Sequence, residues 1–282
     1  MTSMSNDEIY IVPPQLEGVR LDKVLAELLP NSGLRLRRRL CDEGTVLVDG
    51  QKHKPGYKVR PGQEIAIKED EKNMTYEQLG LSVVRQSGLF AAVFKPGGIH
   101  SAHIIGKDTP CAEAALPELF PGSTPILLNR LDCLTSGLLL VALSVDGERI
   151  YREQEEAGEI KKFYLAQIQG RLDGVVTIKT ELDTDDRKTT RVLDELETDE
   201  RRWTDVDVIA HDHENNTTLV RCLIMKGARH QIRAHLASIG HPIVGDPLYG
   251  EGASGDTMFL HHQRVEFPGF SADSKAPWSR EG

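Results

Sequence analysis

The sequence predicts an α+β protein of two domains, in which a small basic domain of helices and strands precedes a strand-rich domain. Helical periodicity followed by a hairpin signal dominates residues 18–67, and strand patterns dominate from residue 81 onward. The length of 282 residues is enough for two hydrophobic cores. With 39% hydrophobic and 27% charged residues, the composition is typical of a folded globular protein and not of a disordered chain.

The first domain begins with two predicted helices. Apolar residues at i, i+3, i+4 and i+7 predict a helix over residues 21–28. A second short helix is expected over residues 34–42, with Leu36 and Leu40 as its buried stripe. Residues 45–50 then have the pattern of a strand followed by a tight Asp-Gly turn, which indicates a hairpin.

Strands dominate the second domain. Ser87-Gly88 joins two of them as a hairpin, and the Lys-Pro-Gly-Gly sequence at 95–98 predicts a loop. Helices are expected over the polar residues 148–156 and over 230–239, where apolar residues recur at i, i+4 and i+7. Strands are expected over residues 82–86, 89–94, 126–128, 138–143, 161–168, 205–210 and 218–224.

A polar segment separates the two patterns. Residues 69–78 are charged and have little periodicity, which indicates a linker. We therefore expect the first domain over residues 1–67, the linker over 68–80 and the second domain over 81–282.

Charge is unevenly distributed along the chain. The formal net charge of −9 would by itself argue against a nucleic-acid partner. Residues 18–60, however, carry ten Lys or Arg and only five Asp or Glu. Arg35, Arg38 and Arg39 fall within about 100° of one another around the second helix. The acidic stretch 181–207 is expected to be solvated surface, so the total charge is a poor guide to the partner.

Several classes of protein are not indicated. The histidines form no HExxH motif, so no catalytic metal is expected. The N-terminus does not resemble a secretory signal, and no apolar run approaches the roughly 20 residues that span a bilayer. We expect a cytoplasmic protein that is not bound to membranes. Its thiols are expected to be reduced, because no short spacing links the four cysteines Cys41, Cys111, Cys133 and Cys222.

The first candidate site is the polar segment 129–137, which separates two strongly apolar strands. On an extended chain, Arg130 and Asp132 point to the same side. A carboxylate at a strand end beside turn residues could act at a cleft. A structural ion pair or a turn-capping aspartate is the alternative, and spacing alone favours it.

Two further segments could bind a ligand. Arg229 and Arg233 lie one turn apart where a glycine-led helix begins, which fits either a phosphate or carboxylate site or a solvated basic face. Tyr164 alternates with apolar residues in the strand 161–166. It could be a core or edge tyrosine, or a platform on which a base stacks.

Together these segments resemble the RluA-type family of pseudouridine synthases. Residues 130–142 (RLDCLTSGLLLVA) resemble its catalytic motif, and residues 230–250 resemble its second long motif. Residues 95–100 (KPGGIH) and 162–166 (KFYLA) match shorter motifs in the expected order, and the LHHQRVEF sequence near the C-terminus resembles the family's terminal hairpin. The basic residues 18–60 resemble the alpha-L RNA-binding motif, named after ribosomal protein S-four.

The resemblance implies the pseudouridine synthase fold, a mixed, mainly antiparallel sheet with flanking helices. It implies an RNA pseudouridine synthase that isomerises uridines in structured RNA and needs no cofactor, because the reaction neither oxidises the base nor transfers a group. The expected substrate is large-subunit ribosomal RNA, with transfer RNA as the alternative. Because no exposed apolar stripe stands out in the sequence, a monomer is expected.

The resemblance also assigns residues. Asp132 falls on the family's catalytic aspartate, Tyr164 on its active-site tyrosine and Arg233 on the basic residue that pairs with the aspartate. Arg130 falls on the arginine implicated in opening the RNA. RNA contacts are further expected from the basic residues Arg35, Arg38, Arg39 and Arg229.

Two departures and two rival hypotheses remain. Asn129 stands where the family usually has histidine, and Gly227-Ala228-Arg229 replaces the usual Gly-Arg-Thr or Gly-Arg-Ser. One rival is a non-catalytic RNA-binding or ribosome-assembly factor on the same fold. The other is an unrelated hydrolase that uses Asp132 with a histidine. Whether Asp132 attacks the sugar or removes a ribose proton stays open.

Overall fold

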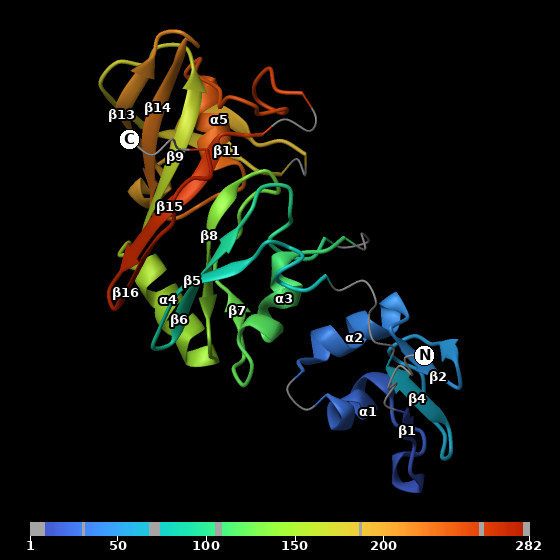
Figure 1. Ribbon diagram of the computed structural model, residues 1–282. Coiled ribbons are helices and arrows are strands. Elements are labelled where there is room, and N and C mark those ends of the chain that lie inside the picture. Colours follow the sequence, from blue (N-terminus) through green and yellow to red (C-terminus); the bar gives the residue numbers. More distant parts are fainter. Residues whose placement is uncertain are drawn as a thin grey trace, which may run out of the picture. The chain divides into compact units, whose positions relative to one another are not determined.

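The computed structural model describes residues 9–29, 32–67, 74–104, 109–185, 188–253 and 257–278 (Figure 1). The chain divides into two compact units between residues 73 and 74, a boundary that falls inside the segment 68–80 expected as a linker. Among the described helices, none is both long and apolar enough to cross a lipid bilayer.

The smaller unit packs two helices against a four-stranded sheet, counted over its described residues, with strand order β1-β4-β2-β3. Buried side chains of both helices and of the sheet share one core, which includes Leu25, Cys41 and Ile65. The elements are β1 (Ile9–Ile11), the 3₁₀ helix η1 (Pro14–Leu16), α1 (Leu21–Leu28), α2 (Leu34–Glu43), β2 (Val46–Val48), β3 (Gln51–Lys52) and β4 (Glu64–Ile67).

Helix α2 is less buried than the sequence predicts. Its sole buried residue is Cys41, Leu40 is half-buried, and Leu36 is 38% exposed. The prediction that Leu36 belongs to the buried stripe is therefore wrong. Four arginines in this ten-residue helix keep most of its surface in water, so the core reaches only the turn that carries Cys41.

The larger unit is built on a mixed sheet of ten strands in the described part of the chain. The path runs β10-β13-β14-β9-β15-β8-β6-β5, and β16 and β7 pair with β15 and β8. Only the β8–β15 pair is parallel, so the predicted mixed, mainly antiparallel sheet is confirmed. The strands are β5 (Ser82–Ser87), β6 (Phe90–Lys95), β7 (Ile126–Leu127), β8 (Ser136–Ala142), β9 (Lys161–Gln169), β10 (Val175–Ile178), β13 (Thr204–Asp212), β14 (Thr217–Ile224), β15 (Leu260–Phe267) and β16 (Phe270–Asp273).

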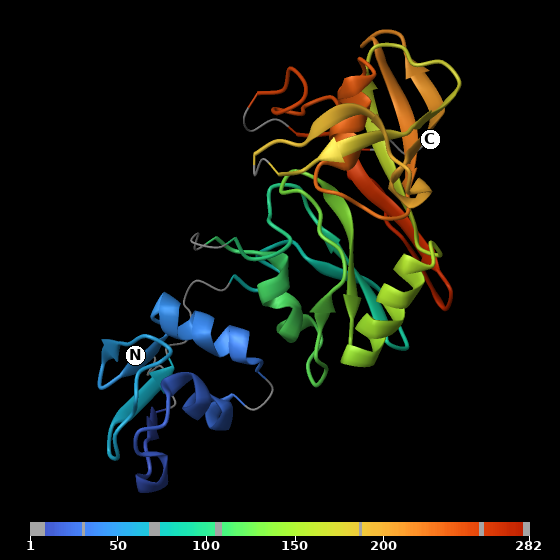
Figure 2. The ribbon, with the colours of Figure 1, turned by 180° about the vertical axis from the view of Figure 1, so that it is seen from behind.

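Helices pack on both faces of this sheet (Figures 1 and 2). Strand β8 is buried throughout, and its side chains alternate between two cores. Leu139 and Val141 join the core that includes residues of α3 (Ala112–Leu119) and α5 (Gln231–Ser238). Leu138 and Leu140 join the core that includes Tyr151 of α4 (Val145–Glu156).

Two segments differ from the sequence-based expectation. Helix α3 was not predicted, because Pro117 lies inside it and interrupts the helical pattern. About half of the described residues of the acidic stretch 181–207 are exposed and most of the others are half-buried, so the expected solvated surface is only part of its role. The stretch contributes to a two-stranded sheet and a 3₁₀ helix, namely β11 (Thr180–Asp183), β12 (Arg191–Leu196) and η2 (Glu200–Arg202).

The parallel pairing of β8 with β15 requires a glycine. Gly137 lies opposite His262 and has a φ of 116°. A Cβ at this position would overlap the backbone of His262. Only glycine adopts such a conformation without a steric penalty. Gly137 therefore lets β8 and β15 approach each other at the start of β8, next to the loop that carries Asp132.

Candidate active site

Asp132 lines an open pocket in the larger unit. It belongs to the loop that leads into β8, and its side chain is 23% exposed. Tyr164 of β9 and Arg233 of α5 line the same pocket, as does Arg130. The structure therefore brings together four residues that the sequence singled out, from segments as much as 103 positions apart.

Arg233 connects Asp132 to a second carboxylate. Its Nη1 donates to Oδ2 of Asp132 at 2.8 Å, while its Nε and Nη2 donate to the two oxygens of Asp246 at 2.7 and 2.8 Å. Asp246 is fully buried and also accepts the backbone N–H groups of Leu248 and Tyr249. Burial alone would raise the pKa of Asp246, but its hydrogen bonds to Arg233 and the arginine's charge lower it. Asp246 therefore fixes the guanidinium so that one nitrogen points at Asp132.

Tyr164 is a buried wall of the pocket. Its ring stacks on His262 with centroids 4.5 Å apart, and burial lowers the pKa of His262 to about 3. Burial, and then the negative charge of Asp132, raise the pKa of Tyr164. Its hydroxyl is therefore protonated at neutral pH. This environment suits packing or hydrogen bonding to a base better than action as a phenolate.

The two arginines flanking the site differ in environment. Arg130 is exposed, and within the described part of the chain no hydrogen bond or ion pair engages its guanidinium. Arg229 instead donates from Nη2 to the carbonyl oxygens of Thr184 and Thr189, at 3.0 and 2.8 Å. Arg229 thus ties the connection between β11 and β12 to the start of α5. An RNA contact by Arg229 stays a prediction.

Two residues that the sequence analysis did not single out hold the loop around Asp132. Ser101 Oγ donates to the carbonyl of Leu131 at 2.7 Å and accepts its N–H at 2.9 Å. The fully buried Lys95 donates from Nζ to Cys133 O at 3.2 Å, and to Pro96 O and Ile99 O. Burial lowers the pKa of Lys95 to about 8, against the opposing effect of Cys133 and Asp132. A charged residue at the end of an apolar strand was the available signal for Lys95.

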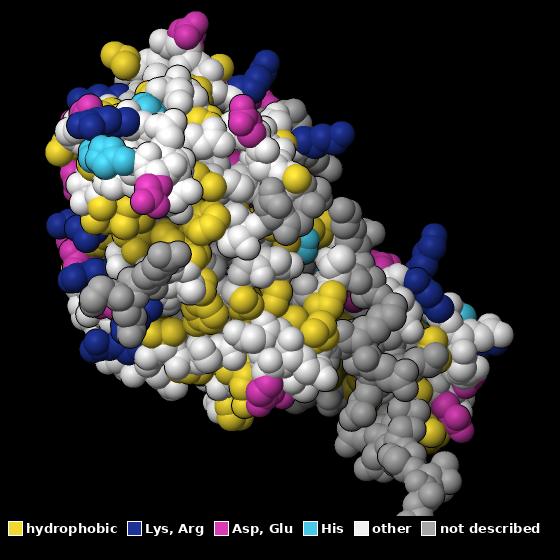
Figure 3. Space-filling model, turned by 45° about the horizontal axis from the view of Figure 1, so that its top comes forward, with side chains coloured by type: hydrophobic (Ala, Val, Ile, Leu, Met, Phe, Trp, Pro, Cys, Tyr) yellow, Lys and Arg dark blue, Asp and Glu magenta, His cyan; other side chains and the backbone are white. Residues whose placement is uncertain are grey.

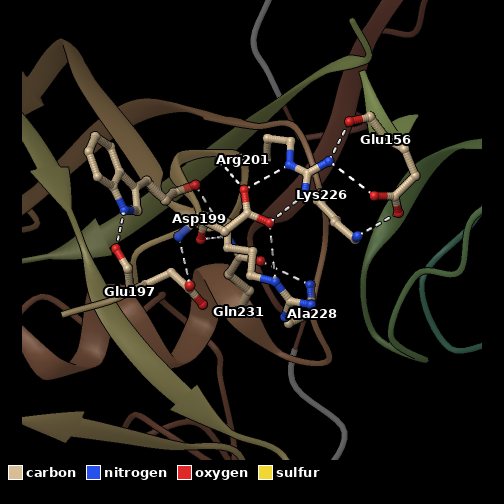
Figure 4. Close-up of polar contacts among 9 residues, drawn as sticks. Glu156, Glu197, Asp199, Arg201, Lys226, Ala228 and Gln231 are labelled. Atoms are coloured by element: carbon tan, nitrogen blue, oxygen red, sulfur yellow. Dashed lines mark hydrogen bonds and ion pairs between the residues drawn. The ribbon is translucent and has the colours of Figure 1, made fainter. Parts of the chain in front are cut away.

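A polar network braces the approach to α5 (Figure 4). Gln231 Oε1 accepts the N–H of Ala228 at 2.9 Å, and its Nε2 donates to the carbonyl of Arg202 at 2.7 Å. Lys226 Nζ lies 2.6 Å from Oε1 of Glu156, at the end of α4. Arg201 donates to both oxygens of Asp199 and to Glu156, so it joins the same network. Part of the acidic stretch therefore supports the loop that positions Arg233.

The side-chain contacts of Asn129 show what asparagine does at the position where the family motif usually has histidine. Its Oδ1 accepts the N–H of Leu140 at 2.7 Å, and its Nδ2 donates to the carbonyl of Leu138 at 3.3 Å. The amide thus pairs with the backbone of β8 in the way a neighbouring strand would. Asn129 is not among the pocket-lining residues, so histidine is not required there for the pocket to form.

In the smaller unit, Arg38 has a structural partner. Its Nε lies 2.9 Å from Oδ2 of Asp22, and Nη2 of Arg20 lies 2.7 Å from the same oxygen. The Asp22 side chain is only 1% exposed. Arg39 makes a looser contact of 3.7 Å with Glu43, and Arg35 is exposed. Of the three arginines of α2 that are expected to contact RNA, Arg38 therefore also stabilises the fold.

Sequence comparison decides the family. A family model described as RNA pseudouridylate synthase matches residues 90–238, more than half of the 282 residues. The chain belongs to this family. A second model, described as S4 domain, matches residues 19–65 and covers the basic unit. The RluA-type resemblance and the RNA-binding N-terminal domain predicted from the sequence are therefore confirmed.

Individual relatives agree with the family assignment. The chain is 30% identical over 91% of its length to an uncharacterized RNA pseudouridine synthase of Chloroflexus aurantiacus, of which it covers 84%. It is 29% identical to the ribosomal large subunit pseudouridine synthase D of Neisseria meningitidis, over 88% of this chain and 68% of that protein. The solved structure of human RNA pseudouridylate synthase domain containing 1 has a TM-score of 0.58 and 26% identity, covering 71% of this chain and 84% of its own.

The chain is thus an RNA pseudouridine synthase, an isomerase, and RNA is its substrate. The predicted enzyme class is confirmed, and the unrelated hydrolase is excluded. Within the described residues, no group of three or more His, Cys, Asp or Glu side chains lies together in a way that could hold a metal ion.

Proposed function

We propose that this pseudouridine synthase modifies specific uridines of large-subunit ribosomal RNA, with Asp132 as its catalytic carboxylate. The observation that carries the residue assignment is the contact between Asp132 and Arg233 at the pocket. The guanidinium of Arg233 holds the carboxylate of Asp132 at the pocket, where it can act as nucleophile or base. The choice of RNA is supported by the similarity to proteins named ribosomal large subunit pseudouridine synthase D.

The reaction needs little from the protein beyond these groups. The bond between ribose C1′ and uracil N1 breaks, the base turns, and a bond forms between C1′ and C5. The hydrogen on C5 is then lost while N1 gains one, so atoms and electrons balance. Asp132 assists at the sugar, and Tyr164 as a neutral phenol contacts the uracil. Flipping a nucleotide out of its stack costs a few kcal/mol. Arg130 is exposed at the pocket, so its side chain is available to fill the space that the base leaves and to offset part of that cost.

Substitution of Asp132 tests the assignment. Asp132→Asn keeps the shape of the side chain and removes its charge, so it is expected to bind ribosomal RNA as the wild type does and to form no pseudouridine. The readout is pseudouridine mapping after incubation with RNA from cells that lack the gene. Asp146→Asn, at a side chain on α4 that is 79% exposed, is the matched control and should remain active.

The outcomes separate the remaining alternatives. Turnover by Asp132→Asn would refute its catalytic role. A wild type that leaves ribosomal RNA as unmodified as the variant does would refute ribosomal RNA as the substrate. Modification of transfer RNA without modification of ribosomal RNA would refute the proposed substrate.

The proposal includes a cytoplasmic monomer that does not bind membranes. The support for the monomer is that no prominent apolar stripe stands out in the sequence. On the face in Figure 3, hydrophobic side chains gather across the middle of the larger unit, so self-association through this face is the outcome that would refute the monomer. Light scattering coupled to size-exclusion chromatography tests the monomer, and cell fractionation tests the location.

A further inference from the structure

We propose that His230 is a positioning residue that orients the second carboxylate oxygen of Asp132. In this role His230 ends a hydrogen-bond chain that begins at the backbone of Thr190, before β12, and passes through Tyr249. The inference rests on the proposed function in that it takes Asp132 as the catalytic carboxylate. It adds a role for three residues outside the Asp132, Tyr164 and Arg233 set.

The hydrogen bonds from Thr190 through Tyr249 to His230 indicate which ring nitrogen of His230 carries the hydrogen. The backbone N–H of Thr190 donates to the phenolic oxygen of Tyr249 at 2.6 Å, and that oxygen lies 3.0 Å from Nδ1 of His230. The N–H of Thr190 can only donate, so the Tyr249 oxygen accepts it and keeps its own hydrogen for Nδ1. The opposite tautomer would turn a lone pair of Nε2 toward the carboxylate of Asp132, which the geometry disfavours. A neutral imidazole whose Nδ1 accepts carries its hydrogen on Nε2.

That hydrogen faces the catalytic carboxylate. Nε2 of His230 lies 3.8 Å from Oδ1 of Asp132, while Nη1 of Arg233 lies 2.8 Å from Oδ2. Each carboxylate oxygen therefore faces a different donor. A distance of 3.8 Å is longer than a hydrogen bond, and contacts of this kind often shorten when substrate fills a site.

The backbone of His230 is held in an unusual conformation. Its φ is 55°, in the left-handed region, where a residue other than glycine costs of order 1–3 kcal/mol and persists only if its surroundings impose it. Contacts on both sides impose it here. Thr190 Oγ1 donates to the carbonyl of Arg229 at 2.8 Å, and the N–H of Ala234 donates to the carbonyl of His230 at 2.9 Å. This conformation places the imidazole between Tyr249 and Asp132.

Burial is the main effect that keeps His230 neutral. Burial lowers its pKa, Asp132 opposes this effect, Arg233 and Arg229 lower the pKa further, and Asp246 raises it. The net direction is downward, so a single ring N–H is present at neutral pH. This agrees with the assignment of that hydrogen to Nε2, which rests on the geometry.

NMR of the full-length protein with ¹⁵N-labelled histidine tests the tautomer without any need for activity. The His230 signals are those that vanish in His230→Gln. We expect Nε2 to be protonated and Nδ1 not, a shift toward the other tautomer in Tyr249→Phe, and a lower His230 pKa in Asp132→Asn. A wild type with hydrogen on Nδ1, or one that Tyr249→Phe leaves unchanged, would overturn the proposal.

Kinetics test whether the contact orients Asp132. Gln places an amide nitrogen near the position of Nε2, whereas Asn tolerates the left-handed backbone but is too short. His230→Asn is expected to lower kcat about tenfold with little change in KM, and His230→Gln to recover part of that loss. Tyr249→Phe should also lower kcat, yet add little in the His230→Asn background, because both residues act through one path.

The controls distinguish failure of the positioning role of His230 from failure of the proposed function. Thermal unfolding confirms that each variant is folded. Fully additive losses in the double variant, or losses in KM alone, would refute the positioning role. If the wild type forms no pseudouridine while the NMR finds the Nε2–H tautomer and its dependence on Tyr249, the proposed function fails and the hydrogen-bond chain stands.

Discussion

Nη1 of Arg233 lies 2.8 Å from Oδ2 of Asp132, and this ion pair joins a partly exposed carboxylate to a guanidinium that is 7% exposed. Nε and Nη2 of the same guanidinium donate to Asp246, which is fully buried. One arginine therefore bridges two carboxylates with different tasks. Asp246 fixes the arginine, and the arginine orients Asp132.

The buried carboxylate is expected to matter for stability. Asp246→Asn leaves the Arg233 guanidinium without its charged internal partner, so the free energy of unfolding should fall by about 3 kcal/mol. Asp132→Asn removes only the partly exposed partner and should cost less than 1 kcal/mol. Urea denaturation measures both. Equal losses would show that Asp246 does not anchor the arginine.

Ser101 is expected to support catalysis by fixing the backbone of the loop that carries Asp132. Ser101→Ala removes the hydroxyl that satisfies both backbone groups of Leu131, which should cost about 2 kcal/mol of unfolding free energy. Because Leu131 precedes Asp132, kcat should fall while KM for RNA changes little. Ser123→Ala, at an exposed serine, is the control. Unchanged stability and kcat in Ser101→Ala would refute the supporting role.

Local patterns were sufficient for much of the fold. Strand β8 was predictable because a run of apolar residues buried on both faces needs no distant partner to be recognised. Helix α3 was not, because Pro117 disrupts its periodicity and the helix is maintained by packing of Ala115 and Leu116 in the core. In the described part of the chain, strands β11 and β12 form a two-stranded sheet of exposed and half-buried residues, so no buried apolar alternation marks them in the sequence.

The site was predictable only in part. Motif resemblance placed Asp132, Tyr164 and Arg233, and the structure places all three at one pocket. Asp246 was not singled out, because its task depends on a loop that folds back 13 residues after Arg233. His230 likewise has no local signal, since its role requires a tyrosine from that same returning loop.

Acid should destabilise the smaller unit through Asp22. Its hydrogen bonds to Arg20, and secondarily to Arg38, lower its pKa from 3.8 to about 2, against the effect of burial. The folded state therefore binds this proton less readily than the unfolded chain. About 2 kcal/mol of stability is present above pH 4 and is lost as the pH falls from 4 to 2.

Hydrogen exchange of the full-length protein measures this effect in α1 and α2. The wild type should keep its protection at pH 6 and lose part of it near pH 3. Asp22→Asn should be less protected already at pH 6 and change less with acid. A variant whose protection at pH 6 equals that of the wild type would contradict the assigned role of Asp22.

The exposed arginines of α2 should make binding to RNA depend on salt. The test replaces Arg35 and Arg39 with Gln and keeps Arg38, whose partner Asp22 is buried. The slope of log affinity against log salt should become shallower by about 1 to 2, because each phosphate contact that no longer forms means fewer counterions released on binding. Filter binding at several salt concentrations measures it. Arg149→Gln, on α4 and paired with Glu153, should leave the slope unchanged. An unchanged slope in the double variant would mean that Arg35 and Arg39 are solvent-exposed side chains that do not contact RNA phosphates.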